Sequence, residues 1–227
     1  MASPFFGENK SNWSDMSDYV VHFAKDYEEK SAYDNMLSIL GGRVIKARNP
    51  FGLMREKAPD PKSQRVACFS EIPLYRLRRL AEARSEYGIV FRKDSVIHRG
   101  ANPIMYAYKD HDMTAALKQI AKSAKKDADH PIWRITPFVD APGKYGNKTY
   151  FFEWEREWRK TGHFKFSEDD VAFLIIPEKL HKAARGFFDD AKVENLGPSY
   201  ECPFIDPFWN RKKIKPLLPK YAEENDA

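Results

Sequence analysis

The order of strand-like and helix-like segments is the feature that most limits the folds open to this chain. Segments rich in β-branched and aromatic residues alternate with amphipathic segments, but without the regular strand–helix–strand rhythm of a parallel α/β fold. The sequence also lacks the glycine fingerprints of Rossmann and P-loop nucleotide sites. The strand-like segments are 18–25, 43–47, 65–72, 89–97, 103–108 and two more within 163–177. The sequence therefore predicts the α+β class.

The clearest helix signal surrounds residues 32–40. Ser31 with Asp34 three positions later forms a capping-box pattern, in which each side chain can accept a hydrogen bond from the other residue's backbone. The apolar residues that follow share one helical face. Gly41 and Gly42 then mark the expected end of the helix, since glycine readily adopts the conformation that stops a helix.

Two further helices and two loops follow from similar signals. Pro73 opens one predicted helix and Gly88 is expected to stop it. The other helix, at 112–126, has apolar residues on one side and lysines on the other. The Pro- and Gly-bearing segments 49–64 and 136–149 predict loops, and the first of these is expected to be exposed.

Length and composition predict a single globular unit. A chain of 227 residues with 42% apolar residues can bury a substantial core. We expect an N-terminal extension over 1–17, a domain over 18–197 and a proline-rich, irregular tail over 198–227. The longest apolar run, Val171 to Pro177, is far shorter than the roughly 20 residues that cross a bilayer. No signal-peptide pattern opens the sequence, so the expected location is the cytoplasm, with no membrane partner.

The formal charge of +5 is unevenly distributed along the chain. Residues 74–126 hold 12 Lys or Arg and 5 Asp or Glu, a net charge of +7, which leaves −2 for all other residues. A basic surface suits nucleic acid or an acidic protein as partner. Helix faces exposed only to solvent would give the same count, and the sequence alone leaves both interpretations open.

The stretch FFEWEREWRK, residues 151–160, is the strongest candidate for chemistry. As a strand, it would place three glutamates on one face, where mutual repulsion leaves some of them poised as acids or bases. As a helix, it would pair Glu155 with Arg159 and pack the two tryptophans together, an entirely structural role. The residues that follow favour a stretch that ends as a strand. The three glutamates are Glu153, Glu155 and Glu157.

The other polar candidates carry weaker signals. Cys68 is expected to be a buried strand residue, and its spacing from Cys202 fits neither a disulfide framework nor a zinc site. No metal is predicted, because the histidines are scattered. His22, near a strand end, could orient a ligand but is more often a structural residue. Ser70 lacks the glycines of a nucleophile elbow.

Several motifs in order resemble the AbiGi family of bacterial abortive phage-resistance proteins. They are VVHFAKDYEEKSAYDNMLSILGGRVIKA, ACFSEIPLYRLRRLAEARSEYGIVFRKDSV, GANPIMYAY, and EREWR followed by DDVAFLIIP, and together they span about 20 to 180. Members of this family are labelled antitoxins. The resemblance implies a phage-defence or toxin–antitoxin component, with a cognate toxin or antitoxin as partner, and an AbiGi-like domain over 18–197.

The layout of these motifs is also similar to that of ADP-ribosyltransferases, in which NAD lies in a cleft of a split, mixed β-sheet flanked by helices. That similarity implies NAD as a substrate, with no other cofactor. His22 would hydrogen-bond a ribose hydroxyl and Tyr106 would pack near the nicotinamide. Glu155 and Glu157 would match the E-x-E pair, with one carboxylate stabilising the oxocarbenium ion and the other deprotonating the acceptor.

Two hypotheses of different classes remain open. The first is a phage-defence protein with an ADP-ribosyltransferase-like fold and activity toward NAD. The second is a non-catalytic antitoxin, or a module that binds nucleic acid through 74–126. The sequence lacks a clear Ser-Thr-Ser strand of the arginine-modifying transferases, so it does not decide whether the protein is an enzyme.

Overall fold

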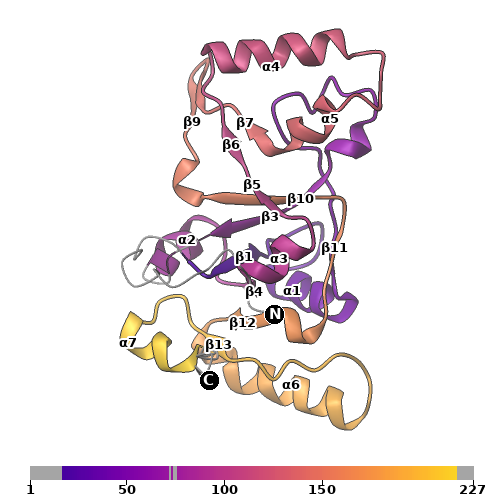
Figure 1. Cartoon of the computed structure of the whole chain (residues 1–227). Coiled ribbons are helices and arrows are strands. Elements are labelled where there is room, and N and C mark those ends of the chain that lie inside the picture. The colour runs from indigo at the N-terminus through magenta and orange to yellow at the C-terminus, as the bar shows by residue number, and fades with distance from the viewer. Residues whose placement is uncertain (1–16, 72, 74–75, 219–227) are drawn as a thin grey trace, which may run out of the picture. The chain divides into compact units, whose positions relative to one another are not determined.

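The protein's structure, a computed structural model, describes residues 17–71, 73 and 76–218 (Figure 1). The described residues fall into two compact units, and the division into an extension, one domain and a tail stays a prediction. Unit 1 is formed within Met1–Arg43, Ile72–Arg92 and Phe166–Ala227, and unit 2 is formed by Val44–Glu71 and Lys93–Lys165.

The predicted terminal segments lie partly outside the described residues. The N-terminal extension is described only at residue 17, and residues 219–227 of the predicted tail are likewise not described. Residues 198–218 are described and are not uniformly irregular, because they contain a short strand and a short helix. Among the described residues, every helix is too short or too polar to cross a lipid bilayer.

Unit 1 is built on four strands in the order β13-β12-β4-β1. They are β1 Tyr19–Phe23, β4 Gly88–Arg92, β12 Val171–Ile175 and β13 Phe204–Ile205. β4 is antiparallel to both β1 and β12, and β13 is parallel to β12. β12 is buried along its whole length, which explains its unbroken apolar sequence. This mixed sheet and the flanking helices confirm the α+β class; the more specific transferase-like fold stays a prediction.

The capping box of the first helix, α1 Ala32–Gly42, is confirmed. The Ser31 side chain accepts a hydrogen bond from the Asp34 backbone, and the Asp34 side chain accepts one from Ser31. The predicted glycine stop is wrong by one residue. Both glycines belong to the helix, and Arg43, with φ of +49°, adopts the left-handed conformation that ends it. Its backbone N–H donates to the last free carbonyls of the helix, a bond that this conformation allows.

Gly88 does not stop the second helix, α2 Leu77–Ala83, as the sequence predicted. It is instead the first residue of β4, where a Cβ atom would come within 2.8 Å of the Val21 side chain. The glycine therefore permits close strand packing rather than a helix cap. The remaining helices of unit 1 are α6 His181–Val193 and α7 Arg211–Ile214.

Unit 2 contains three strands in the order β3-β10-β5, all antiparallel to their neighbours. They are β3 Val66–Glu71, β10 Glu157–Thr161 and β5 Asn102–Pro103. β10 is therefore the middle strand of the three. The shorter strands pair as β2 Val44–Ile45 with β11 Phe164–Lys165, β6 Met105–Tyr106 with β7 Val139–Asp140, and β8 Gly143–Tyr145 with β9 Lys148–Tyr150.

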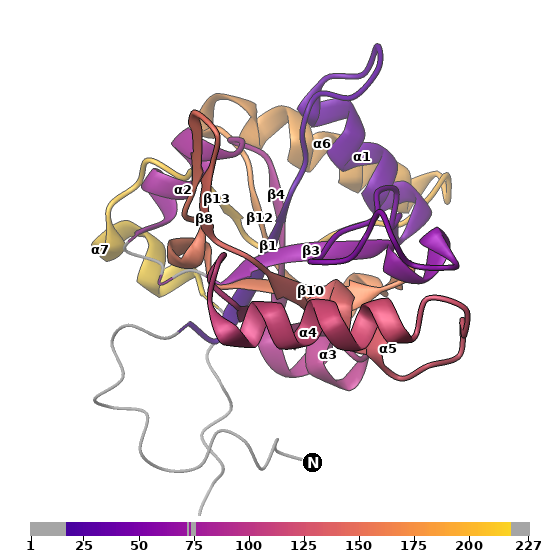
Figure 2. The ribbon, with the colours of Figure 1, turned by 90° about the horizontal axis from the view of Figure 1, so that it is seen from above.

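The helices of unit 2 are α3 Lys93–His98, α4 Asp112–Ser123 and α5 Ile132–Ile135. α4 confirms the predicted helix at 112–126, and Figure 2 shows it beside α5. Ala121 and Ala124 pack with Trp133 in a small core that also includes Met54 and Ala58. Since both of the latter are buried, the expectation that loop 49–64 is exposed is wrong at these two residues.

Two segments differ from the predicted secondary structure. The strand expected over 89–97 ends at Arg92, and the chain turns into α3 at Lys93. Lys93, the first residue of α3, is buried and its ammonium lies 2.7 Å from the carboxylate of Glu71, a residue distant in sequence. The predicted loop 136–149 contains β7 and most of the β8–β9 hairpin, with Gly146 at a φ of +59° in the two-residue turn. Short 3₁₀ helices complete the described chain, at Pro61–Gln64, Thr136–Phe138, Glu153–Glu155, Glu168–Asp170, Glu178–Leu180 and Lys215–Leu217.

Candidate functional site

The candidate stretch 151–160 is neither a continuous strand nor a helix. Glu153–Glu155 forms a 3₁₀ turn, η6, and β10 begins at Glu157. Between them Arg156 adopts a φ of +46°, and its carbonyl accepts a hydrogen bond from the Glu71 backbone at 3.2 Å. The expectation that the stretch ends as a strand is confirmed. The row of three glutamates on one strand face is wrong, because the left-handed residue changes the direction of the chain before Glu157.

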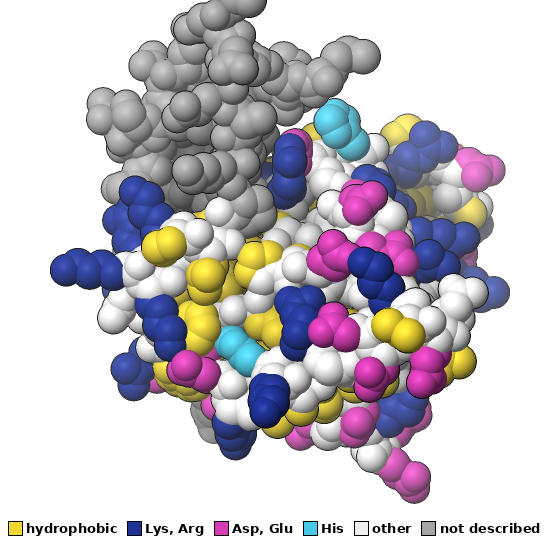
Figure 3. Space-filling model, turned by 90° about the horizontal axis from the view of Figure 1, so that it is seen from below, with side chains coloured by type: hydrophobic (Ala, Val, Ile, Leu, Met, Phe, Trp, Pro, Cys, Tyr) yellow, Lys and Arg dark blue, Asp and Glu magenta, His cyan; other side chains and the backbone are white. Residues whose placement is uncertain are grey.

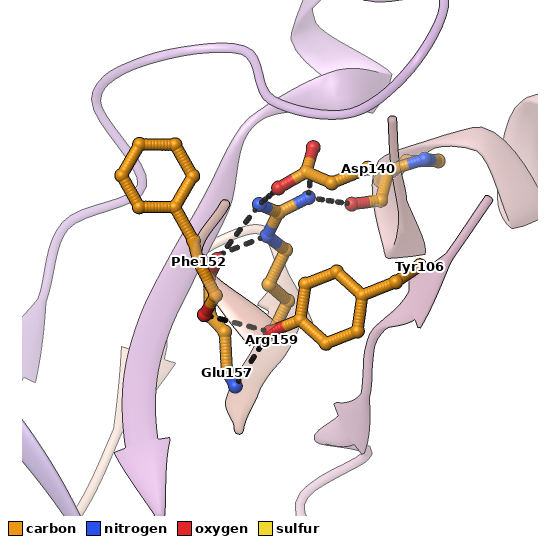
Figure 4. A network of polar contacts seen from close by, with 6 residues as sticks. Tyr106, Asp140, Phe152, Glu157 and Arg159 are labelled. Atoms are coloured by element: carbon orange, nitrogen blue, oxygen red, sulfur yellow. Dashed lines mark hydrogen bonds and ion pairs between the residues drawn. The ribbon is translucent and has the colours of Figure 1, made fainter. Parts of the chain in front are cut away.

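Arg159 is the centre of the polar network in unit 2 (Figure 4). It lies on the middle strand with 1% of its surface exposed. Its Nε and Nη2 atoms each donate to one carboxylate oxygen of Glu157, both at 2.9 Å. This two-point pairing of a planar guanidinium with a carboxylate is the strongest common form of ion pair in proteins. The pair joins residues i and i+2 of one strand, in place of the helical Glu155–Arg159 pair that the sequence allowed.

The remaining donors of Arg159 point to residues that precede the β8–β9 hairpin. Nη1 donates to the Pro137 carbonyl at 2.8 Å and to Asp140 at 3.3 Å, and Nη2 donates to the second Asp140 oxygen at 2.5 Å. Burial alone lowers the pKa of Arg159, but the two carboxylates more than offset it, so the net shift is upward. The guanidinium therefore stays charged and fully hydrogen-bonded.

Two further side chains border the network. Cys68 pairs with Arg159 across β3 and β10. Burial and then the nearby Glu157 carboxylate raise the pKa of the Cys68 thiol, which therefore stays protonated and is a poor nucleophile. Tyr106 accepts a hydrogen bond from the Glu157 backbone at 3.3 Å, and its hydroxyl donates to the Phe152 carbonyl at 3.5 Å. Burial raises the pKa of Tyr106 to about 12.

The predicted NAD-site residues are divided between the two units. Glu157 and Tyr106 are neighbours in unit 2, and Glu155 lies in the η6 turn of the same unit with 4% of its surface exposed. His22 lies on β1 of unit 1, half-buried and paired with Ile89 of β4. The assignment of these four residues to one NAD site stays a prediction.

Sequence reasoning missed Asp140 and the central position of Arg159. Asp140 lies in FVDAPG, which has the composition of a loop, and no local pattern links it to a residue 19 positions later. The alternation of charge in 157–159 did indicate that Glu157 and Arg159 share a strand face, which was the available signal. Among the described residues, no group of three or more His, Cys, Asp or Glu side chains is placed to hold a metal ion.

The basic segment 74–126 does not form one continuous element. It contributes α2 and β4 to unit 1 and α3 and α4 to unit 2. Some of its cations are engaged in ion pairs, as Arg78 with Glu82 and Lys93 with Glu71 show. These ion pairs favour ordinary solvated faces for part of the segment. Basic and acidic side chains are mixed on the face that Figure 3 shows from below.

The fold and this site can be compared with known proteins. Residues 44–196 match the model of a family described as "Putative abortive phage resistance protein AbiGi, antitoxin". The match covers more than half of the chain and places it in a class of phage-resistance proteins. The chain belongs to the AbiGi family. No curated protein and no solved structure matches it.

Proposed function

We propose that this protein is an antitoxin of a phage-defence system and that it acts by binding a cognate toxin rather than by catalysis at Glu157. Membership of the AbiGi family supports the phage-defence role. One observation carries the non-catalytic part of the proposal: both carboxylate oxygens of Glu157 are hydrogen-bonded by the buried Arg159.

The competing function is an ADP-ribosyltransferase that uses Glu157 on NAD. A catalytic carboxylate of this kind must direct negative charge and an acceptor oxygen toward the ribose as positive charge develops there. At Glu157 that charge faces a guanidinium, and Arg159 is held in place from the opposite side by Asp140. To reach a substrate, the Glu157 carboxylate would have to break its ion pair with Arg159. The buried guanidinium would then keep only Asp140 as a charged partner, and such a loss costs free energy.

Glu155 is also poorly suited to act as the second member of an E-x-E pair. It lies in the η6 turn, whereas Glu157 lies on β10, and the left-handed Arg156 separates them. Glu155 is nearly fully buried, so an acceptor could approach it only if the turn moved. The geometry therefore favours a structural role for Glu157 and Arg159.

The decisive experiment measures growth and NAD cleavage together. The chain is expressed alone from an inducible promoter, and the purified protein is incubated with NAD while nicotinamide release is followed. An antitoxin causes no growth arrest, and nicotinamide release matches that of Glu157→Gln. Growth arrest or release that is lost specifically in Glu157→Gln, and kept in the exposed control Glu178→Gln, would establish the transferase instead.

A second experiment tests the binding function directly. Co-expression of the chain should restore growth to cells that produce its toxin, and Glu157→Gln should also restore growth wherever that variant accumulates to the same level. Failure of the wild-type chain to restore growth under any expression ratio argues against the antitoxin role.

A further inference from the structure

Unit 2 exposes a group of aromatic side chains that the ion-pair network does not use. They lie two residues after β6, in the β8–β9 hairpin and around the η6 turn. We call this group the aromatic surface, and its members are the exposed Tyr108, Tyr145, Phe151, Phe152 and Trp154 together with the half-buried Tyr150. Phe151 has 52% of its surface exposed and Phe152 has 40%. Large apolar rings at such exposure, close together, mark a binding surface more often than a solvated face.

Three of the rings are in contact with one another. Tyr145 packs edge-on against Tyr150, with ring centroids 5.7 Å apart, and Tyr150 lies 5.8 Å from Phe152. Figure 4 shows the Phe152 ring turned away from the ion-pair network, while its backbone carbonyl faces Tyr106. The network thus holds the backbone of this segment and leaves the rings for a partner.

Basic side chains are interleaved with these rings. Residues 143–152, GKYGNKTYFF, contain Lys144 and Lys148 and no acidic residue. Lys109 places its ammonium 4.7 Å from the centre of the Tyr145 ring and donates to the Lys144 carbonyl at 2.7 Å. This approach requires Gly143, because a Cβ there would lie 2.6 Å from Cβ of Lys109. Gly143 also has a φ of +155°, at the edge of the region that favours glycine.

Two acidic residues make contacts beside this surface. Asp110 lies 3.7 Å from the Lys109 ammonium, and the Tyr108 hydroxyl is hydrogen-bonded to the Glu153 side chain, which raises the pKa of Tyr108. The hairpin residues 143–150 themselves carry two lysines and no carboxylate, so the charge on the hairpin is positive. Lysines beside exposed rings match a ligand that carries both anionic groups and flat faces.

We propose that the aromatic surface binds single-stranded nucleic acid, with bases stacked on the exposed rings and phosphates paired with Lys144 and Lys148. Stacking on aromatic side chains together with a basic border is the usual means of holding single strands without sequence preference. A duplex presents its phosphates but keeps its bases stacked inside, so it can use only the lysines. This site shares Tyr108 and Lys109 with the segment 74–126, but the lysines proposed to contact phosphates lie in the β8–β9 hairpin. It does not depend on the toxin-binding function.

The test uses fluorescence anisotropy with a labelled 15-residue oligothymidylate and with a duplex of the same length. Wild-type protein is expected to bind the single strand more tightly than the duplex at low salt. Phe152→Ala should weaken single-strand binding by about tenfold, since stacking on one ring commonly contributes that factor. Phe187→Ala, which removes a ring from α6 in unit 1 that is more exposed than Phe152, should leave binding unchanged.

The lysines are tested by salt dependence. For single strands the slope of log affinity against log salt falls in magnitude by about 0.7 for each phosphate that the protein no longer neutralises, so Lys144→Ala with Lys148→Ala should reduce it by about 1.4. Thermal melting of every variant checks that the fold is retained. Absent binding at low salt, equal binding of duplex, or full binding by Phe152→Ala would each overturn the proposal. If no oligonucleotide binds and Phe152→Ala fails to neutralise the toxin, the aromatic surface is a protein interface instead.

Discussion

Replacement of Arg159 by lysine isolates the contribution of guanidinium geometry to the stability of unit 2. Lysine keeps the positive charge and most of the apolar stem but has a single nitrogen with three N–H donors. Arg159 makes hydrogen bonds from Nε to Glu157, from Nη1 to Pro137 and Asp140, and from Nη2 to Asp140 and Glu157. At least two of these five bonds must therefore be lost in Arg159→Lys.

The size of the loss follows from the burial of the site. Arg159 is 1% exposed, so water cannot readily replace a missing donor. A hydrogen bond to a charged group contributes about 1.5 to 3 kcal/mol, and two of them give a loss of about 3 kcal/mol or more. Since a domain is stable by only about 5 to 15 kcal/mol, this is a large fraction of the total.

Urea denaturation followed by circular dichroism measures this free energy of unfolding. Arg78→Lys serves as the matched control, because Arg78 pairs with Glu82 on an exposed helix face, with 69% of its side chain accessible. Such a pair contributes about 0.5 kcal/mol or less, so this control should unfold almost like the wild type. If Arg159→Lys and Arg78→Lys differ by less than about 0.5 kcal/mol, the guanidinium network does not stabilise the fold as argued.

Two other substitutions test backbone and titration arguments. Gly52→Ala should lower the free energy of unfolding by about 3 kcal/mol, because Gly52 has a φ of +93° and the new Cβ would lie 2.0 Å from the Thr136 carbonyl oxygen. Gly41→Ala, in the last turn of α1 with nothing within 4 Å, should instead raise it by about 0.5 to 1 kcal/mol; equal effects in the two denaturation curves would refute the contrast. The pKa of Tyr106 is about 12 in the folded protein, against an ordinary value of 10.0, so the unfolded phenol ionises first and stability falls as pH rises between these values. Tyr106→Phe should lose less stability over that range in urea titrations, and an identical pH slope would contradict the assignment.

Local signals in the sequence were sufficient for some elements and not for others. The first helix was predictable because Ser31 and Asp34, which cap it, are three residues apart. The end of β4 was not predictable, because the strand-like sequence pattern continues past Arg92, whereas α3 begins at Lys93. The partner of Lys93, Glu71, is distant in sequence. The hairpin at 143–150 could not be predicted from the sequence, because its residues have the composition of an ordinary loop.

The candidate site shows the same division between local and distant information. The shared face of Glu157 and Arg159 could be deduced from their spacing of two residues on a strand. The partner Asp140 and the left-handed Arg156 could not, since both depend on contacts with segments far away in the sequence. The resemblance to AbiGi proteins was confirmed, over 44–196, whereas a role in NAD chemistry remains a prediction.

The middle strand β10 also carries a means of excluding misaligned pairing. On one face Trp158 donates its indole N–H to Glu71 at 2.9 Å and lies beside the Lys93 ammonium, while on the other face Arg159 meets Asp140. A shift of one residue would bring the Arg159 cation toward Lys93 and leave Asp140 facing an indole. A shift of two would restore the faces but place an uncharged or acidic residue against Asp140. Polar contacts on both faces of β10 therefore disfavour every shifted pairing and specify a single strand register.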